Sequence, residues 1–228
     1  MHKFLFFALP LLVSFNLSAQ EKKRFTINPG ETVMQAIPRQ DIFRYPGFKL
    51  ADVSFKDGRG GQATLNYNSV YGEMQFLDAN GDTVSIADEN SIRWIAVGVD
   101  TFYFQEGWLE QLAHNMNSKL AKKKLIQLSN RDKNAGMGVS GFATETNTKS
   151  TASQQTRDII AKETLTYTEY DSYYFGDHFN KFFPANKKNL LNIYRKQQGK
   201  VEQYLQDNKI DFTVEADLEK LFVYLQGL

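Results

Sequence analysis

The residues around Asp78 have types and spacing that could bind a calcium ion. Asp78, Asn80 and Asp82 stand at alternate positions, and calcium takes such oxygen ligands. A complete EF-hand loop also has Gly at its sixth position and Glu at its twelfth. Counted from Asp78, Gly81 is fourth and Glu89 is twelfth, so only the last requirement is met. Asn-Gly between two apolar runs is typical of a tight hairpin turn, and the sequence favours that interpretation.

Two histidines outside the N-terminal segment, His114 and His178, are the next candidates for chemistry. The chain has no cysteine, so a zinc site would need both histidines and carboxylates such as Glu110 or Asp177. Their spacing matches no zinc-ligand pattern. The sequence therefore predicts no metal site.

A weak match to a nucleophile elbow occurs at Gly138-Val139-Ser140-Gly141. The motif needs Gly at its fifth position, where this chain has Phe142. No glycine-rich phosphate loop of either common type occurs. The sequence therefore predicts no catalytic residue and no cofactor. Asp and Glu are plentiful, so a pair of carboxyl groups about 5–9 Å apart, as glycosidases use, stays open as an alternative.

Aromatic side chains on predicted strands are the remaining indication of a binding site. Tyr71, Tyr103, Trp108 and Tyr173 are predicted to contact a ligand or partner, because flat rings stack on sugars and form the centres of protein interfaces. The alternative is the ordinary preference of aromatic residues for strands. A basic cluster, Lys119 with Lys122–Lys124, is interpreted as the protection of an edge strand against aggregation.

These residues lie in a region that reads as successive short strands, from about Ile42 to Leu128. Apolar and polar residues alternate in each strand, and Asp-Gly, Asn-Gly and other turn residues separate them. The spacing leaves no room for crossover helices, so the strands should form an antiparallel meander, as an open sheet, a sandwich or a partial barrel. Ile92–Val97 is apolar on both faces, which predicts a central strand. The predicted strands are 50–55, 62–68, 73–77, 83–86, 92–97, 101–104, 108–113 and 119–128.

The rest of the chain changes character twice. Residues 129–162 are polar and predict a long flexible insertion, after which residues 163–183 return to strands. From residue 184 to 228 the apolar period becomes helical and predicts three short helices packed on the sheet. Gly199 is predicted to end the first of them. The fold class is therefore α+β, mainly β, with an N-terminal segment at residues 20–41.

Several short stretches carry a family resemblance. They are Asp57-Gly58, Leu65-Asn66-Tyr67-Asn68, Tyr71-Gly72-Glu73-Met74-Gln75-Phe76 and Gly81-Asp82-Thr83, with the pattern from Lys187 to Phe222. In them the chain resembles uncharacterised secreted proteins of Bacteroidota-type bacteria. The resemblance covers about two thirds of the chain beyond residue 19. It implies an exported location and no particular activity, ligand or catalytic residue.

The first nineteen residues have the three parts of a secretory signal peptide. A positive start at Lys3 precedes an uncharged run from Phe4 to Phe15, and Ser18-Ala19 offers a cleavage site before Gln20. The run is shorter than the roughly 20 residues that a membrane-spanning helix needs. Without cysteine there is no lipoprotein anchor and no disulfide. The predicted location is therefore periplasmic or secreted, with an uncleaved N-terminal anchor as the alternative.

Charge limits the classes of partner. Of the 27 basic residues only Lys3 lies in the signal segment, so 26 basic residues balance the 26 acidic residues of the mature chain. Nucleic-acid binding would need a basic excess. The sequence favours a non-enzymatic binding or structural module of the cell envelope, with an envelope protein or glycan as its partner. The alternatives are a secreted hydrolase of polysaccharide or peptide, and a membrane-associated assembly that docks through the C-terminal helices.

Overall fold

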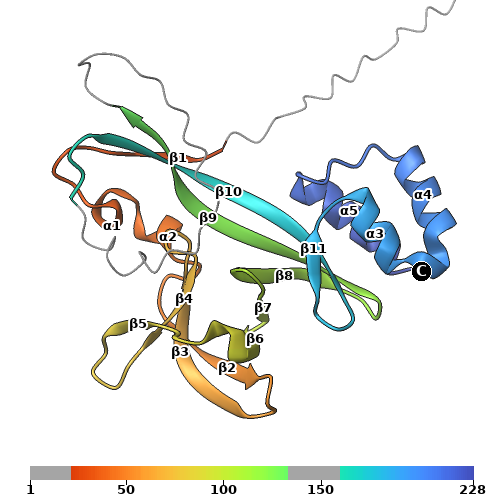
Figure 1. Cartoon of the computed structure of the whole chain (residues 1–228), viewed down its shortest axis with the longest axis horizontal. Helices are drawn as coiled ribbons and strands as arrows, with labels where there is room; N and C mark the ends of the chain where they lie inside the picture. The colour runs from red at the N-terminus through yellow and green to blue at the C-terminus, as the bar shows by residue number, and fades with distance from the viewer. Residues whose placement is uncertain (1–21, 133–159) are drawn as a thin grey trace, which may run out of the picture.

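The computed structural model describes residues 22–132 and 160–228, which form an antiparallel sheet with short helices near both ends of the chain (Figure 1). The predicted signal peptide, residues 1–19, and most of the predicted insertion lie outside the described residues. The strands are β1 (Arg24–Ile27), β2 (Lys49–Phe55), β3 (Gly60–Asn68), β4 (Glu73–Leu77), β5 (Thr83–Ser85), β6 (Ile92–Val97), β7 (Asp100–Phe104), β8 (Trp108–His114), β9 (Ser118–Asp132), β10 (Thr164–Asp177) and β11 (Phe182–Pro184). The mainly β class is confirmed.

The helices are short and lie at the two ends of the described chain. They are α1 (Val33–Ala36), α2 (Arg39–Ile42), α3 (Lys187–Ile193), α4 (Gln198–Asp207) and α5 (Glu215–Leu225), with single 3₁₀ turns η1 (Glu89–Ser91) and η3 (Arg195–Gln197). The three predicted C-terminal helices are thus confirmed. None of the helices in the described ranges is long and apolar enough to cross a membrane.

Two antiparallel meanders build the sheet, and they join where β2 pairs with β6. One meander is β2-β3-β4-β5 and the other is β6-β7-β8-β9-β10, while β1 and β11 both pair with β10. Ile95 of β6 lies opposite Val53 on one side and Phe102 on the other. The strand is therefore interior, as its two apolar faces predict.

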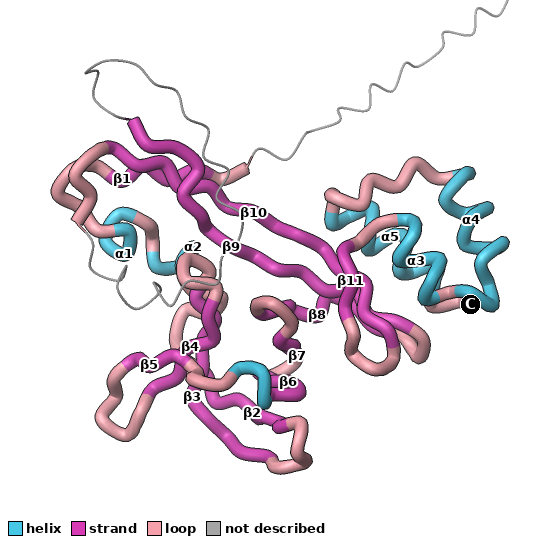
Figure 2. The backbone as a smooth tube through the Cα atoms, in the orientation of Figure 1, coloured by secondary structure: helices cyan, strands magenta, loops and turns pink. Residues whose placement is uncertain are grey.

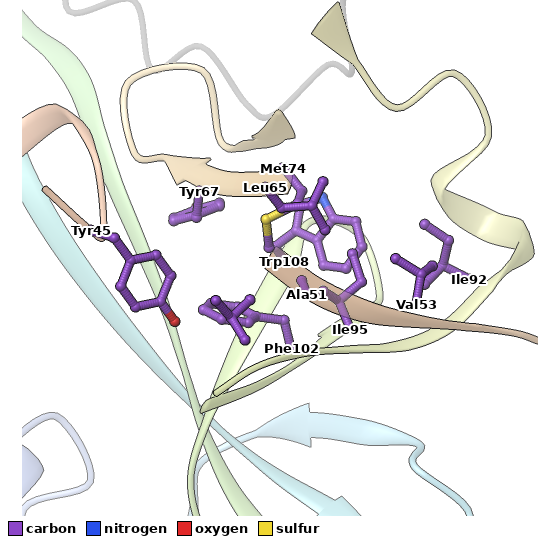
Figure 3. Packing of buried hydrophobic residues seen from close by; sticks show 11 residues of the cluster. Tyr45, Ala51, Val53, Leu65, Tyr67, Met74, Ile92, Ile95, Phe102 and Trp108 are labelled. Atoms are coloured by element: carbon purple, nitrogen blue, oxygen red, sulfur yellow. The ribbon is translucent and has the colours of Figure 1, made fainter. Parts of the chain in front are cut away.

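Strands β2 to β9 curl around one apolar cluster. Of the three shapes that the sequence allows, an open sheet, a sandwich and a partial barrel, this curl is most similar to the partial barrel. The curl brings the end of β3 to β9, where Ile126 N–H donates to Ser69 O at 2.8 Å and Tyr67 O–H donates to Lys124 O at 2.7 Å. Figure 3 shows side chains from several strands meeting inside the curl. The buried residues are Tyr45, Ala51, Val53, Leu65, Tyr67, Met74, Ile92, Ile95, Val97, Phe102 and Trp108.

The long hairpin of β9 and β10 carries the rest of the structure. The two strands pair from Ser118–Asp177 at one end to Asp132–Thr164 at the other. At the Asp132 end, Ile126 packs in an apolar cluster with residues of β1, α1 and α2. At the Ser118 end, Leu120 and Phe175 pack in a second cluster with α3, α4 and α5. We call these three helices the helical cap.

Two asparagines on the outer face of β3 explain the Leu65-Asn66-Tyr67-Asn68 pattern. Leu65 and Tyr67 point into the curl, while Asn66 and Asn68 are completely buried on the other face. The Asn66 amide bonds with Tyr45 N and O and with Gly47 O. The Asn68 side chain accepts N–H bonds from Val70 and Tyr71 and donates to Gln75. Each buried amide is thus satisfied, as its burial requires.

The structure corrects three predictions. First, β9 extends to Asp132 and pairs there with β10, so residues 129–132 of the insertion predicted at 129–162 belong to a strand. Second, β9 lies between β8 and β10, so the edge-strand interpretation of Lys119 and Lys122–Lys124 is wrong. Third, Gly199 lies inside α4 and does not end α3. The helical period alone could not detect the intervening 3₁₀ turn.

The N-terminal segment, predicted only as residues 20–41, has structure of its own. Strand β1 alternates exposed and buried residues, but it is too short for the alternation to be a strong signal. Helix α1 begins at a capping box in which Thr32 and Gln35 bond reciprocally. That signature, Thr followed three residues later by Gln, was readable from the sequence.

The substitution Asn68→Ala should lower the free energy of unfolding by about 3 kcal/mol, because it removes three hydrogen bonds at a fully buried position and leaves their partners unsatisfied. Urea unfolding measures this loss. Asn80→Ala is the matched control, since Asn80 is exposed in the β4–β5 turn and should change stability by less than about 0.5 kcal/mol. Equal losses for the two variants would contradict the structural role of Asn68.

Candidate functional site

The aromatic residues predicted to bind a ligand do not form one surface. Trp108 is 1% exposed inside the curl, where its indole N–H donates to Glu89 Oε1 at 2.7 Å. Tyr103 is buried on the outer side of the sheet, with its ring centroid 5.2 Å from that of Phe182. Its hydroxyl donates to Gln111 Oε1. Both rings are therefore used in packing.

The other two predicted aromatic residues lie in different parts of the molecule. Tyr173 is buried against the helical cap, and its hydroxyl donates to Glu215 Oε2 at 3.0 Å. Tyr71 is partly exposed in the β3–β4 turn. Three of the four rings thus sit in three separate apolar clusters, and in this conformation none of those three offers a free face to a ligand from solution.

Charged side chains join the curl to the β8 strand. Arg44, which precedes β2, donates from Nε to both Glu110 oxygens at 3.0 Å and from Nη2 to Oε1 at 2.7 Å. The same guanidinium lies 3.6 Å from Asp100, which accepts the Tyr45 hydroxyl at 2.7 Å. Burial and the bond to Asp100 raise the pKa of Tyr45 well above its usual value. Tyr45 therefore stays protonated and donates its hydrogen bond throughout the physiological range.

A second group of charges fixes the helical cap to the hairpin. Lys122 of β9 donates to Glu215 Oε2 at 2.9 Å, beside the Tyr173 hydroxyl, and Lys124 pairs with Glu169 at 3.0 Å. Burial disfavours the charge on Lys122 and lowers the pKa of this lysine. The hydrogen bond to Glu215 and the charge of Glu215 together outweigh burial, so the pKa of Lys122 is raised. These pairs hold elements together, so the lysine cluster is explained by contacts across and beyond the sheet.

Asp171 on β10 differs from the paired carboxylates. Asp171 lies opposite Lys124 on β9, and Asp171 as a whole is exposed to solvent. Nevertheless, the surrounding protein removes enough water from the carboxyl to raise the pKa of Asp171. This burial outweighs the charges of Lys122 and Lys124, which lower the pKa, and the smaller effects of Glu169 and Glu215 add to the rise. A carboxyl held in such an environment is a candidate acid for hydrolysis.

The candidate metal-binding residues are accounted for without a metal. Asp78 Oδ1 accepts N–H bonds from Asn80 and Asp82 at 2.8 and 2.9 Å, and Gly81 has a φ of 86°, so the segment is the predicted hairpin turn. Within the described ranges, no group of three or more histidine, aspartate or glutamate side chains is placed to hold a metal ion. The segment Gly138–Gly141 lies outside those ranges.

The two histidines lie apart, His114 at the end of β8 and His178 in the β10–β11 turn. His114 Nδ1 lies 3.3 Å from Gln111 Nε2 near the end of β8. His178 stacks against Phe179 in the β10–β11 turn, with ring centroids 3.8 Å apart. Neither has a carboxylate partner among the ion pairs of residues 22–132 and 160–228.

The helical cap is firmly attached at the β8–β9 turn. Asn115 Nδ2 donates to the Tyr194 hydroxyl at 2.9 Å and to Leu225 O at 3.1 Å. The Tyr194 hydroxyl also lies 2.6 Å from Ser118 Oγ. One buried tyrosine therefore connects the end of α3, the turn and the last residues of α5. Surface residues on the cap are consequently held in a fixed arrangement.

A concentrated positive charge lies on this cap. Lys187, Lys188, Arg195, Lys196 and Lys200 occur within 187–200 without a single acidic residue between them, and all five are exposed. The ion pairs of the described chain include none of them. We call residues 187–200 the basic segment. Its five charges are available to an anion in solution.

Two shallow, open hollows lie along the basic segment. One of about 460 Å³ is lined by Lys187, Lys188, Leu191, Asn192 and Gln198. The other, of about 380 Å³, is lined by Gly199, Lys200, Gln203, Tyr204, Asp207 and Tyr224. The rings of Tyr204 and Tyr224 stack on each other, with their centroids 4.0 Å apart. Hollows of this depth suit a surface contact better than the enclosure of a small molecule.

Comparison with known proteins identifies no relative: no family model, curated protein or solved structure matches the chain. The basic segment was readable from the sequence as five basic residues without an acidic one. This segment was not among the sequence-based predictions because the charges of residues 20–228 sum to zero, and a total conceals how charge is distributed along the chain.

Asp171→Asn should raise the melting temperature at about pH 7, because a raised folded-state pKa means that ionisation of Asp171 costs stability once the pH exceeds that pKa. The gain should disappear below about pH 3.9, where the unfolded carboxyl is protonated too. Melting curves across this pH range test the sign.

Asp57→Asn is the control with the opposite sign. Hydrogen bonds from the Arg59 backbone and side chain lower the pKa of Asp57, so its carboxylate stabilises the fold above its unfolded-state pKa and loses that effect as the pH falls. Asp57→Asn should therefore lower the melting temperature at neutral pH. A loss of stability in both variants would show that Asp171 is a stabilising partner of its lysines.

Proposed function

We propose that the protein is an exported, non-enzymatic binding module of the cell envelope that holds an anionic partner at the basic segment. The observation that supports this function is the group of five exposed cations on a rigidly attached cap. A run of exposed charges of one sign attracts an oppositely charged partner and directs its approach. Near the hairpin, by contrast, Arg44, Lys122 and Lys124 are engaged in ion pairs with carboxylates.

The envelope location rests on the signal-peptide pattern of residues 1–19 and on the resemblance to secreted proteins. Export with cleavage after Ala19 would leave Gln20 as the first residue. Expression of the full chain in a bacterial host, fractionation and the intact mass of the product test this prediction. A product that retains residues 1–19 in the membrane fraction would show an uncleaved anchor instead.

A secreted hydrolase is the second candidate, and Asp171 is the observation that favours it. Its raised pKa is typical of the acid in a glycosidase, and the charges of Glu169 and Glu215 act on the same carboxyl. The purified protein would then release reducing sugar from envelope polysaccharide or new amino termini from envelope peptide. Activity that Asp171→Asn abolishes would support the hydrolase, whereas activity unchanged by this substitution would assign it to another site or a contaminant.

The binding proposal predicts that retention on phosphocellulose depends on the basic segment. The wild-type protein should elute at higher salt than Lys188→Glu/Lys196→Glu, because each reversal replaces an attraction with a repulsion. Lys56→Glu/Arg93→Glu is the matched control: it changes the net charge equally at exposed positions outside the cap. The control should elute above the basic-segment variant. Coincident elution of the two variants would show that net charge alone governs binding and would overturn the proposal.

A further inference from the structure

Two exposed apolar side chains project from neighbouring turns at one end of the molecule. Met116 in the β8–β9 turn is 93% exposed and Phe179 in the β10–β11 turn is 77% exposed. Ser118 and Asp177, which border the two turns, are opposite each other on β9 and β10. The turns therefore extend from the same end of the long hairpin, as Figure 2 shows for the two loops beside the helical cap.

Both turns are held in shape by side-chain hydrogen bonds. In the β8–β9 turn, Asn115 Oδ1 accepts N–H bonds from Asn117 and from Ser118, the first residue of β9. Asp177 Oδ1 likewise accepts N–H bonds from Phe179 and Lys181. The apolar side chains are thus presented by ordered turns, so little conformational freedom would be lost if they were buried by a partner.

The same end of the molecule carries part of the basic segment. Asn115, next to Met116, bonds to the hydroxyl of Tyr194, and Arg195 and Lys196 follow Tyr194 in the chain. Lys181 lies in the turn that carries Phe179 and its Nζ is 5.4 Å from the Phe183 ring centroid. Apolar tips and exposed cations therefore occur together here.

We propose that this end of the molecule docks on an anionic lipid surface, with Arg195 and Lys196 of the basic segment against the headgroup phosphates and with Met116 and Phe179 inserted at the boundary of the acyl chains. The proposal rests on the proposed function of the basic segment and identifies its anionic partner as lipid. Cations beside an anionic membrane and apolar side chains that enter its interface add their contributions. Neither group alone gives stable attachment, as single weak membrane signals generally do not.

The pattern fits a lipid surface better than an acidic protein or polysaccharide. A protein partner would need a continuous, well-packed contact area, whereas here the apolar residues are separate tips and the adjacent hollows are shallow and open. A polysaccharide would use the charges but leave the apolar tips in water. Other exposed apolar side chains, such as Leu50 and Val99, belong to different hairpins of the sheet and provide controls.

Flotation with phosphatidylcholine vesicles, with and without phosphatidylglycerol, tests the proposal on the full mature chain. The wild-type protein should float only with vesicles that contain phosphatidylglycerol. Arg195→Glu/Lys196→Glu should weaken binding by at least about twenty-five-fold, since each neutralised cation accounts for about fivefold. Met116→Ser/Phe179→Ser should weaken it by about tenfold because both side chains leave the interface.

Leu50→Ser/Val99→Ser is the matched apolar control and should float as the wild type does. All of these substitutions are at exposed positions, and unchanged melting temperatures verify that the variants are folded. Wild-type binding to phosphocellulose but not to the anionic vesicles would overturn the lipid assignment and leave the binding function intact, with an acidic protein or polysaccharide as partner. Vesicle binding unaffected by the Met116 and Phe179 substitutions would also overturn it. Failure to bind either anionic surface would overturn both proposals.

Discussion

The pairing of β9 with β10 is the interaction on which the rest of the structure depends. The two strands form an uninterrupted ladder apart from one irregularity near Thr166. Three packed units attach to it: the curl through β8 and Ser69, the N-terminal helices through Ile126, and the helical cap through Leu120 and Phe175. Loss of this pairing would separate the clusters, since the short helices cannot be stable alone.

Charge has two distinct roles in this arrangement. Around the hairpin, opposite charges meet at short distances and join elements that are remote in the sequence, as Arg44–Glu110 and Lys122–Glu215 do. On the helical cap, cations of one sign are left exposed. Repulsion among these cations lowers the stability of the fold slightly. A protein can retain such a cost where the charges serve to bind a partner of opposite charge. We therefore infer binding from the unpaired charges and attribute stability to the paired ones.

Much of the sheet could be predicted from the sequence because alternation and turn residues are local signals. Ile92–Val97 has the predicted bounds of β6, and the stripe of Leu218, Leu221 and Leu225 predicts α5. The full length of β9 could not be predicted, since residues 129–132 are polar and are ordered by pairing with β10. The predicted aromatic site shows the same limit. Strand position and ring type do not reveal that Trp108 and Tyr173 are buried by distant segments.

The two buried asparagines of β3 have a consequence for how the strand can align. A slip of one residue would exchange Leu65 and Tyr67 with the asparagines and place amides in the apolar interior, which alternation alone forbids. A slip of two residues preserves the alternation and is normally the harder error to prevent. Here it would move Asn66 away from the backbone groups of Tyr45 and Gly47, and Asn68 away from the side chain of Gln75 on β4. Buried amides without partners are costly, so the asparagines specify one register among those that the apolar pattern permits.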